Sequence, residues 1–289
     1  MYNSKICETT LVRVLSPTDM RERRDDEYAI VLSGKKSNAK AGCRCCDFKD
    51  GTVSFYRPRK PYVAEQNAGM ECIPDCQNES DGIVLLFSEE LLRCSESAWK
   101  PEDFSFFSYC YKESLHVSAR EKEKLECIIR SIMEEQEWGF DKYSCRLILR
   151  KIEMLLIYCK RYYDRQFQIR SEACRCQISK IEEAAEERIR RSKSAEATPE
   201  AIDEIATAVG MSAAYLSDYI LQNNGMSIKE FLQRLQLDMA RRALTETTDC
   251  TCHIAKDLGF RSARQMRIVF ESVYGMTPKE YRKDPQTNS

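Results

Sequence analysis

The sequence predicts a two-domain α+β protein, in which a β-rich N-terminal half ends in helices and the C-terminal half is all helical. Three observations predict it. The chain has 289 residues, which favours two domains over one. Short apolar runs, separated by Gly, Asn, Asp and Pro clusters, occupy the first hundred residues. From about residue 118 onward the apolar residues recur at helical spacing. We place the boundary near residue 170, which gives domains 1–170 and 171–289.

Four segments of the first hundred residues fit strands. Glu27–Ser33 is a short apolar run that stops before Gly34, and Lys40–Phe48 is a second candidate. Gly51–Tyr56 alternates between apolar and polar residues, which is typical of a strand with one buried face. Ile83–Phe87 is a continuous apolar run and suits a strand that is buried on both faces.

Two helices are expected to follow these strands. Ser118 and Glu121 have the spacing of a capping box, and Lys142–Tyr163 fits a second helix. Each helix has one apolar stripe: Leu125, Ile128, Ile129, Ile132 and Met133 in the first, and Leu147, Ile148, Ile152, Leu155 and Leu156 in the second. The stripes are interpreted as core, with a dimer surface as the alternative, because an isolated two-helix layer usually needs a partner.

Composition narrows the function classes. The 45 basic and 46 acidic residues give a net charge of −1, which excludes a polycation but leaves room for a local basic surface. No apolar run reaches the ~18 residues that a membrane span needs, and residues 1–14 lack the apolar centre of a secretory signal, so a cytoplasmic protein is expected. With two histidines and no nucleophile motif around either, the sequence predicts no enzyme, no metal site and no cofactor.

Fifteen cysteines are expected to be mostly reduced thiols, many of them small buried apolar residues. Some are closely spaced, but the sequence does not contain two C-x2-C motifs, the pair that would indicate a zinc site. A thiol- or zinc-responsive sensor is therefore kept as an alternative function. The closely spaced cysteines are Cys43, Cys45 and Cys46, then Cys72 and Cys76, Cys174 and Cys176, and Cys250 and Cys252.

The C-terminal half contains an internal repeat. Ile205-Ala206 recurs as Ile254-Ala255 at an offset of 49, and Gly225-Met226-Ser227 recurs as Gly275-Met276-Thr277 at an offset of 50. In each copy a short helix ends at a glycine, which adopts a left-handed conformation cheaply, and a serine then opens a second helix. This is the pattern of a helix-turn-helix, whose second helix enters the DNA major groove. A helical repeat that only packs is the alternative.

Residues 200–283 resemble the DNA-binding domain of the AraC/XylS family of bacterial transcription regulators. The stretches that carry the resemblance are IDEIATAVGMSAAYLSDYI, GMSIKEFLQRLQLDMARRAL, HIAKDLGF and VFESVYGMTPKEYR. The resemblance implies a first helix-turn-helix at about 202–224, a linker helix at about 228–244 and a second helix-turn-helix at about 251–274. It implies a sequence-specific, effector-responsive regulator whose two recognition helices enter successive major grooves of double-stranded DNA.

The two recognition helices are expected from Ser212 and from Ser262, and they differ in charge. Residues 195–239 hold two basic and seven acidic side chains, whereas residues 240–289 hold nine basic and six acidic ones. The second helix-turn-helix is therefore expected to neutralise most of the phosphates that the protein contacts. Two departures from the family pattern are Asp218 and the segment Ile268–Glu271. The predicted DNA-contacting residues are Ser212, Ala213, Ala214, Ser217, Asp218, Arg261, Ser262, Ala263, Arg264, Gln265 and Arg267.

The N-terminal half resembles the sensor half of the same family, most clearly at residues 103–123 and 152–170. This resemblance implies a small cupin-like β-barrel followed by a helical dimerisation layer, hence a homodimer with a small-molecule effector and RNA polymerase as further partners. Arg57, Arg59 and Tyr62 lie at the expected mouth of the barrel and are the predicted effector-binding residues. The sequence names neither the effector nor the operator, and it leaves activation and repression open.

Overall fold

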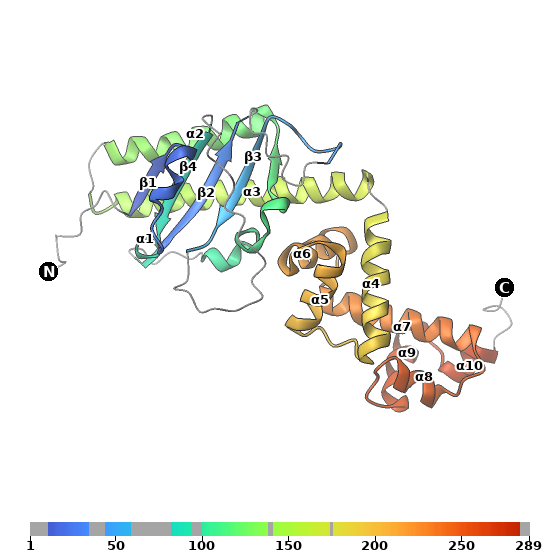
Figure 1. Cartoon of the computed structure of the whole chain (residues 1–289). Helices are drawn as coiled ribbons and strands as arrows, with labels where there is room; N and C mark the ends of the chain where they lie inside the picture. Colours follow the sequence, from blue (N-terminus) through green and yellow to red (C-terminus); the bar gives the residue numbers. More distant parts are fainter. Residues whose placement is uncertain are drawn as a thin grey trace. The chain divides into compact units, whose positions relative to one another are not determined.

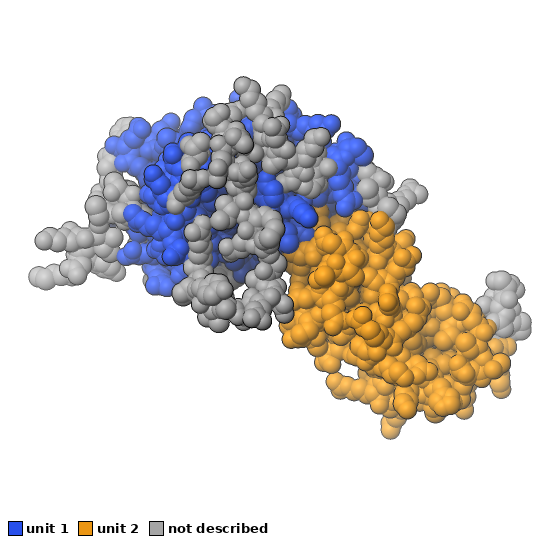
Figure 2. Space-filling view, viewed as in Figure 1, with its two compact units in different colours: residues 1–173 blue, residues 174–289 orange. Residues whose placement is uncertain are grey.

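The structure, a computed structural model, describes residues 11–34, 44–58, 82–93, 100–137, 141–173 and 176–283. The chain divides into two compact units, residues 1–173 and 174–289 (Figure 2). Within the described residues, no helix is long and apolar enough to cross a membrane.

Unit 1 is built on a five-stranded sheet in which every paired strand is antiparallel (Figure 1). The strand order is β1-β4-β2-β3-β5. The two central strands, β2 and β4, are buried almost throughout, as expected from their continuous apolar runs. The strands are β1 Val12–Leu15, β2 Glu27–Ser33, β3 Gly51–Tyr56, β4 Gly82–Ser88 and β5 Leu115–Val117.

Each face of this sheet has its own apolar core. On one face Ala29, Val31 and Leu86 pack with Met20 of the short 3-10 helix η2, Pro17–Glu22. On the other face, aromatic rings from the sheet meet rings from residues 104–107 and from the long helix α3, Ser144–Ala173. The Phe55 ring centroid lies 4.3 Å from that of Phe106 and 6.2 Å from that of Tyr163. The sheet is therefore the middle layer of unit 1.

The mixed α+β class holds, but the expected cupin-like barrel is not seen: the described strands form an open sheet with β1 and β5 at its edges. A sheet without closure must cover its apolar faces with other elements, and here helices do so on one face. The other correction is Lys40–Phe48: residues 40–43 lie outside the described residues, and residues 44–48 form a turn rather than a strand.

Helices α2, Ala119–Glu137, and α3, Ser144–Ala173, pack together behind the sheet, and the short α1, Glu89–Arg93, follows β4 (Figure 1). The capping box at the start of α2 is confirmed, because the Ser118 N–H donates to Glu121 Oε2 at 2.9 Å and the Glu121 N–H donates to Ser118 Oγ at 3.4 Å. Eight of the ten predicted stripe residues are buried. Met133 and Leu147 are exposed instead, so their assignment to the core is wrong.

Unit 2 is all helical in its described part, with the long helix α7 at its centre. Buried α7 side chains such as Phe231, Leu232, Leu235 and Leu244 contribute to its core, and α7 contacts α4, α6, α8 and α10. The helices are α4 Cys176–Ser192, α5 Pro199–Val209, α6 Ala213–Asn224, α7 Ile228–Glu246, α8 Thr251–Asp257, α9 Ala263–Tyr274 and α10 Pro278–Lys283.

Candidate nucleic-acid interface

Unit 2 contains the same helix-turn-helix geometry twice. The first copy is α5, a turn and α6; the second is α8, a turn and α9. Each turn has a glycine in the left-handed region, Gly210 at φ 71° and Gly259 at φ 76°. In each copy a serine hydroxyl then caps the second helix, because Ser212 Oγ accepts from the Tyr215 N–H and Ser262 Oγ accepts from the Gln265 N–H.

The second part of the repeat is also built twice. α6 and α9 both end at a left-handed glycine, Gly225 and Gly275. A capping box then opens the next helix: the Ser227 N–H donates to Glu230 Oε2 at 2.8 Å, and the Thr277 N–H donates to a glutamate at the same offset, also at 2.8 Å. The sequence repeat therefore corresponds to a repeat of hydrogen bonds and backbone conformations.

Aromatic packing holds α9 against the rest of unit 2. The Phe270 side chain is fully buried, with its ring centroid 4.5 Å from that of Tyr274 and 5.4 Å from that of Tyr281 on α10. The apolar side chains of Leu216, Ile220, Met266 and Phe270 are buried, whereas Val269 is only half-buried.

The opposite side of α9 is exposed and basic. Arg261, Arg264 and Arg267, three of the predicted DNA-contacting residues, are all exposed. Arg267 Nε lies 3.7 Å from Glu271 Oε2 one turn later, so part of its charge is balanced on the helix itself. Gln265 has a structural role as well: its Oε1 accepts from the Arg261 N–H at 2.8 Å, which helps to close the start of the helix.

The corresponding positions of α6 are less exposed than those of α9. Ala213, Ala214, Ser217 and Asp218, which the sequence predicts to contact DNA, are half-buried. The Ser217 hydroxyl donates to the carbonyl oxygen of Ala213 at 2.8 Å, so it lies along the helix backbone. Short side chains of this kind stay close to the helix, where neighbouring turns cover part of their surface.

Comparison with known proteins supports this reading of unit 2. A family model described as a helix-turn-helix domain matches residues 205–284. A putative AraC-like transcription regulator of Streptomyces antibioticus is 30% identical over 84 residues, which cover 29% of this chain and 28% of that protein. An HTH-type transcriptional regulator of Mycobacterium tuberculosis is 33% identical over 82 residues, covering 28% of this chain and 32% of that protein.

Residues 205–284 form an AraC-type helix-turn-helix domain. Among solved structures, an AraC-type transcriptional regulator from Chromobacterium violaceum is 28% identical, over 28% of this chain and 73% of the other, with a TM-score of 0.27. The match to the two curated relatives spans only about a third of their length or less, so what those proteins do as a whole is not carried over with it.

One cysteine of the described part of unit 2 has a structural explanation. Cys250 occupies the N-cap position of α8, where its Sγ accepts from the His253 N–H at 3.4 Å. In the part of the chain that the structure describes, no three His, Cys, Asp or Glu side chains form a group that could hold a metal ion. Five of the eight free cysteines described there are exposed, contrary to the expectation of burial. Cys43, Cys72, Cys76 and Cys174 lie outside the described residues.

The predicted effector residues are only partly described. Arg57 is exposed at the end of β3, and its backbone carbonyl accepts a hydrogen bond from Arg23 Nη2. Arg59 and Tyr62 lie outside the described residues. Effector binding by these residues therefore stays a prediction.

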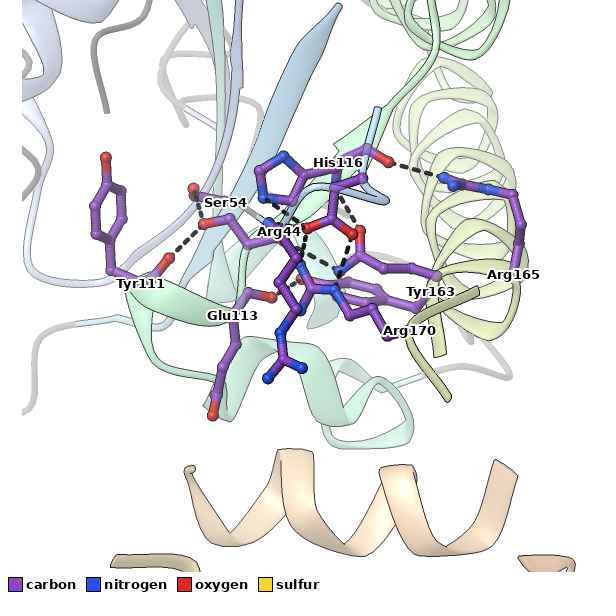
Figure 3. Close-up of polar contacts among 11 residues, drawn as sticks. Arg44, Ser54, Tyr111, Glu113, His116, Tyr163, Arg165 and Arg170 are labelled. Atoms are coloured by element: carbon purple, nitrogen blue, oxygen red, sulfur yellow. Dashed lines mark hydrogen bonds and ion pairs between the residues drawn. The ribbon is translucent and has the colours of Figure 1, made fainter. Parts of the chain in front are cut away.

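Unit 1 contains a buried polar cluster that the sequence analysis did not predict (Figure 3). The Arg170 side chain, near the end of α3, donates from Nε and Nη2 to the two carboxylate oxygens of Asp47 at 2.9 and 2.6 Å. Both side chains are at most 4% exposed. His116 Nε2 lies 3.9 Å from Asp47 Oδ2, and the His116 backbone N–H donates to Gln166 Oε1 at 2.7 Å.

These contacts set the charge of Asp47. Burial alone raises the pKa of its carboxyl, but the hydrogen bonds and positive charge of Arg170 outweigh burial, so the pKa of Asp47 is lowered. The ion pair joins the turn at residues 44–47 to the last turns of α3. The cluster thus fixes the C-terminal end of unit 1.

Proposed function

We propose that this chain is a sequence-specific, double-stranded-DNA-binding transcription regulator that acts in the bacterial cytoplasm. The observation that carries the proposal is the doubled helix-turn-helix of unit 2, in which both turns have the same glycine conformation and both second helices have the same serine cap. In this proposal α6 and α9 enter neighbouring major grooves, and α7 sets their spacing.

In this proposal the second helix-turn-helix, α8 and α9, makes the stronger contacts with DNA. Arg261, Arg264 and Arg267 are exposed on and just before α9, and arginine recognises guanine edges and phosphate oxygens. Ser262, Ala263 and Gln265 stand at the positive end of the helix macrodipole, where backbone N–H groups favour phosphate. α6, Ala213–Asn224, contains no lysine or arginine, so it reads DNA through Ser212, Ala213, Ala214 and Ser217, with Asp218 accepting from a cytosine amino group.

The chain acts as a homodimer in this proposal, with α3 as the contact. The exposed apolar residues are Tyr143, which directly precedes α3, and Leu147, Met154 and Ile157 on the helix, spaced by four, seven and three residues. This is the a/d spacing of a coiled-coil seam, and a second copy of α3 presents the same residues. A stripe of large apolar side chains that is left uncovered in one copy is typical of a protein–protein contact.

Unit 1 is the effector-binding part of the regulator in this proposal. A small polar or anionic effector binds near Arg57, Arg59 and Tyr62 and shifts the population of DNA-competent arrangements. RNA polymerase is the expected partner at the promoter. Among the described residues, no group of three His, Cys, Asp or Glu side chains supports the alternative of a zinc sensor.

Selection of bound fragments from random duplex DNA by the purified full-length protein tests the proposal. We expect one enriched motif with two contact blocks about one helical turn apart. The same selection with added zinc, and after oxidation of the thiols, is the control for the sensor alternative. Failure to enrich any sequence under all of these conditions, for the full chain and for residues 171–289 alone, would contradict DNA recognition.

A further inference from the structure

The middle of α9 presents an apolar side chain where the rest of the exposed face is polar. Ile268 is 57% exposed, although Met266 and Phe270 on either side of it are fully buried. One helical turn before it stands Arg264, and one turn after it stands Ser272, both exposed. Ile268 therefore lies at the centre of the face that points away from the core of unit 2.

Charged side chains surround Ile268, which is the apolar side chain at the centre of that face. Glu271, three residues later, has Arg267 beside it at 3.7 Å. Among the described residues, no side chain forms an ion pair with Arg264. Isoleucine is also stiff in a helix, because branching at Cβ leaves one strongly preferred χ1 rotamer. Its methyl groups thus form a fixed apolar surface that loses little entropy on contact.

The major groove offers such a surface one kind of partner. Base edges there are mainly hydrogen-bond donors and acceptors, and the C5-methyl group of thymine is the one apolar group that projects from them into the groove. Placed against the donors and acceptors of another base edge, Ile268 would remove water from polar atoms without giving them a hydrogen bond. The side chain thus favours thymine and disfavours the other bases by the same contact.

We propose that Ile268 determines specificity by packing on the methyl group of one thymine in the DNA block that α9 contacts. The inference rests on the proposed function, since it assigns one base preference within the proposed recognition helix. It assigns Ile268 a role separate from that of Arg264: the arginine recognises by hydrogen bonds, and the isoleucine by apolar contact alone.

Thymine-to-deoxyuridine scanning of the selected operator tests this proposal, because deoxyuridine removes only the methyl group. We expect the wild-type protein to lose about fourfold in affinity at one thymine of the α9 block, the factor for one methyl-sized group removed from water. Ile268→Ala is expected to lose about tenfold on the intact operator and to bind thymine and deoxyuridine equally at that position.

Val273→Ala is the matched control. Val273 is 58% exposed on the same helix but lies five residues further along, roughly 140° around the helix axis from Ile268. We expect this variant to keep the wild-type affinity and the wild-type thymine dependence. Thermal unfolding of both variants checks that the fold is retained, which is expected because alanine is a good helix former at an exposed position.

The outcomes separate this inference from the proposed function. Specific binding with no loss at any deoxyuridine, no thymine in the α9 block, or an unchanged thymine dependence in Ile268→Ala would each overturn the role of Ile268 and leave DNA recognition intact. Absence of any selected operator would overturn the proposed function, and this inference with it.

Discussion

The two turn glycines of the repeat provide a matched pair of perturbations. Gly210 and Gly259 both have φ near +70°, where an alanine costs about 1–2 kcal/mol in backbone strain. A Cβ at Gly210 would meet no atom within 4 Å. A Cβ at Gly259 would lie 2.1 Å from the carbonyl oxygen of Lys193 and 2.6 Å from the backbone nitrogen of Ser194.

The difference between the two sites sets the expected magnitudes. At Gly210 the cost of alanine is the strain alone, about 1–2 kcal/mol of unfolding free energy. At Gly259 the clashing atoms belong to the backbone between α4 and α5, which cannot rotate away as a flexible side chain can. Overpacking of this kind adds about 1–3 kcal/mol, so Gly259→Ala is expected to cost about 2–5 kcal/mol in total.

Urea unfolding of the full chain, followed by helical circular dichroism, measures both values. We expect the unit 2 transition of Gly259→Ala to move to lower urea than that of Gly210→Ala, with similar slopes. The reasoning would be refuted if the two variants lost equal stability, or if Gly210→Ala were the weaker protein. Either result would mean that the turn of the second helix-turn-helix does not pack on residues 193–194.

Three further predictions concern the other parts of the account. Asp47→Asn leaves a buried arginine without its charge partner and is expected to cost about 3–5 kcal/mol at pH 7 in urea unfolding. Because the pKa of Asp47 is lowered, the ion pair contributes fully above the ordinary value of 3.8 and less as the pH falls below it, so the variant and the wild type should converge in acid. Arg264→Ala is expected to weaken operator binding by about 1–3 kcal/mol and to relax specificity at one position, which a repeated selection measures; an equal loss on every sequence would make Arg264 a phosphate contact. The double variant Met154→Lys/Ile157→Lys is expected to convert a dimer to a monomer in analytical ultracentrifugation, while Lys160→Ala, which removes no apolar side chain of the seam, should not.

Local sequence patterns predicted helices and strands well where glycine, proline, serine or other polar residues marked both ends of the segment. The strands at 27–33 and 51–56 have the expected bounds, because glycine, proline and polar residues flank their apolar runs. The repeat also predicted its own turns, since only a glycine adopts φ near +70° without strain. Where a serine or a glycine defines a cap, sequence and structure agree to within a residue or two.

Long-range arrangements were not accessible in the same way. Whether a sheet closes depends on the pairing of its edge strands, which alternation within single strands does not encode. The cupin-like barrel was implied by the resemblance alone, and the described strands form an open sheet instead. The Asp47–Arg170 pair joins residues 123 positions apart and leaves no local pattern. Leu147 fits the apolar stripe of its helix, yet it is exposed, because spacing alone does not separate the edge of a core from a seam that awaits a partner.

The most direct test of the central claim is the salt dependence of operator binding. We would compare the wild type with a variant in which Arg261, Arg264 and Arg267 are all alanine, on the selected operator. We expect a steep loss of wild-type affinity with salt, and a slope in the variant that is smaller by about one to three, since each phosphate contact contributes about 0.9. An unchanged slope and affinity would contradict the claim that α9 is the main DNA-contacting helix of this protein.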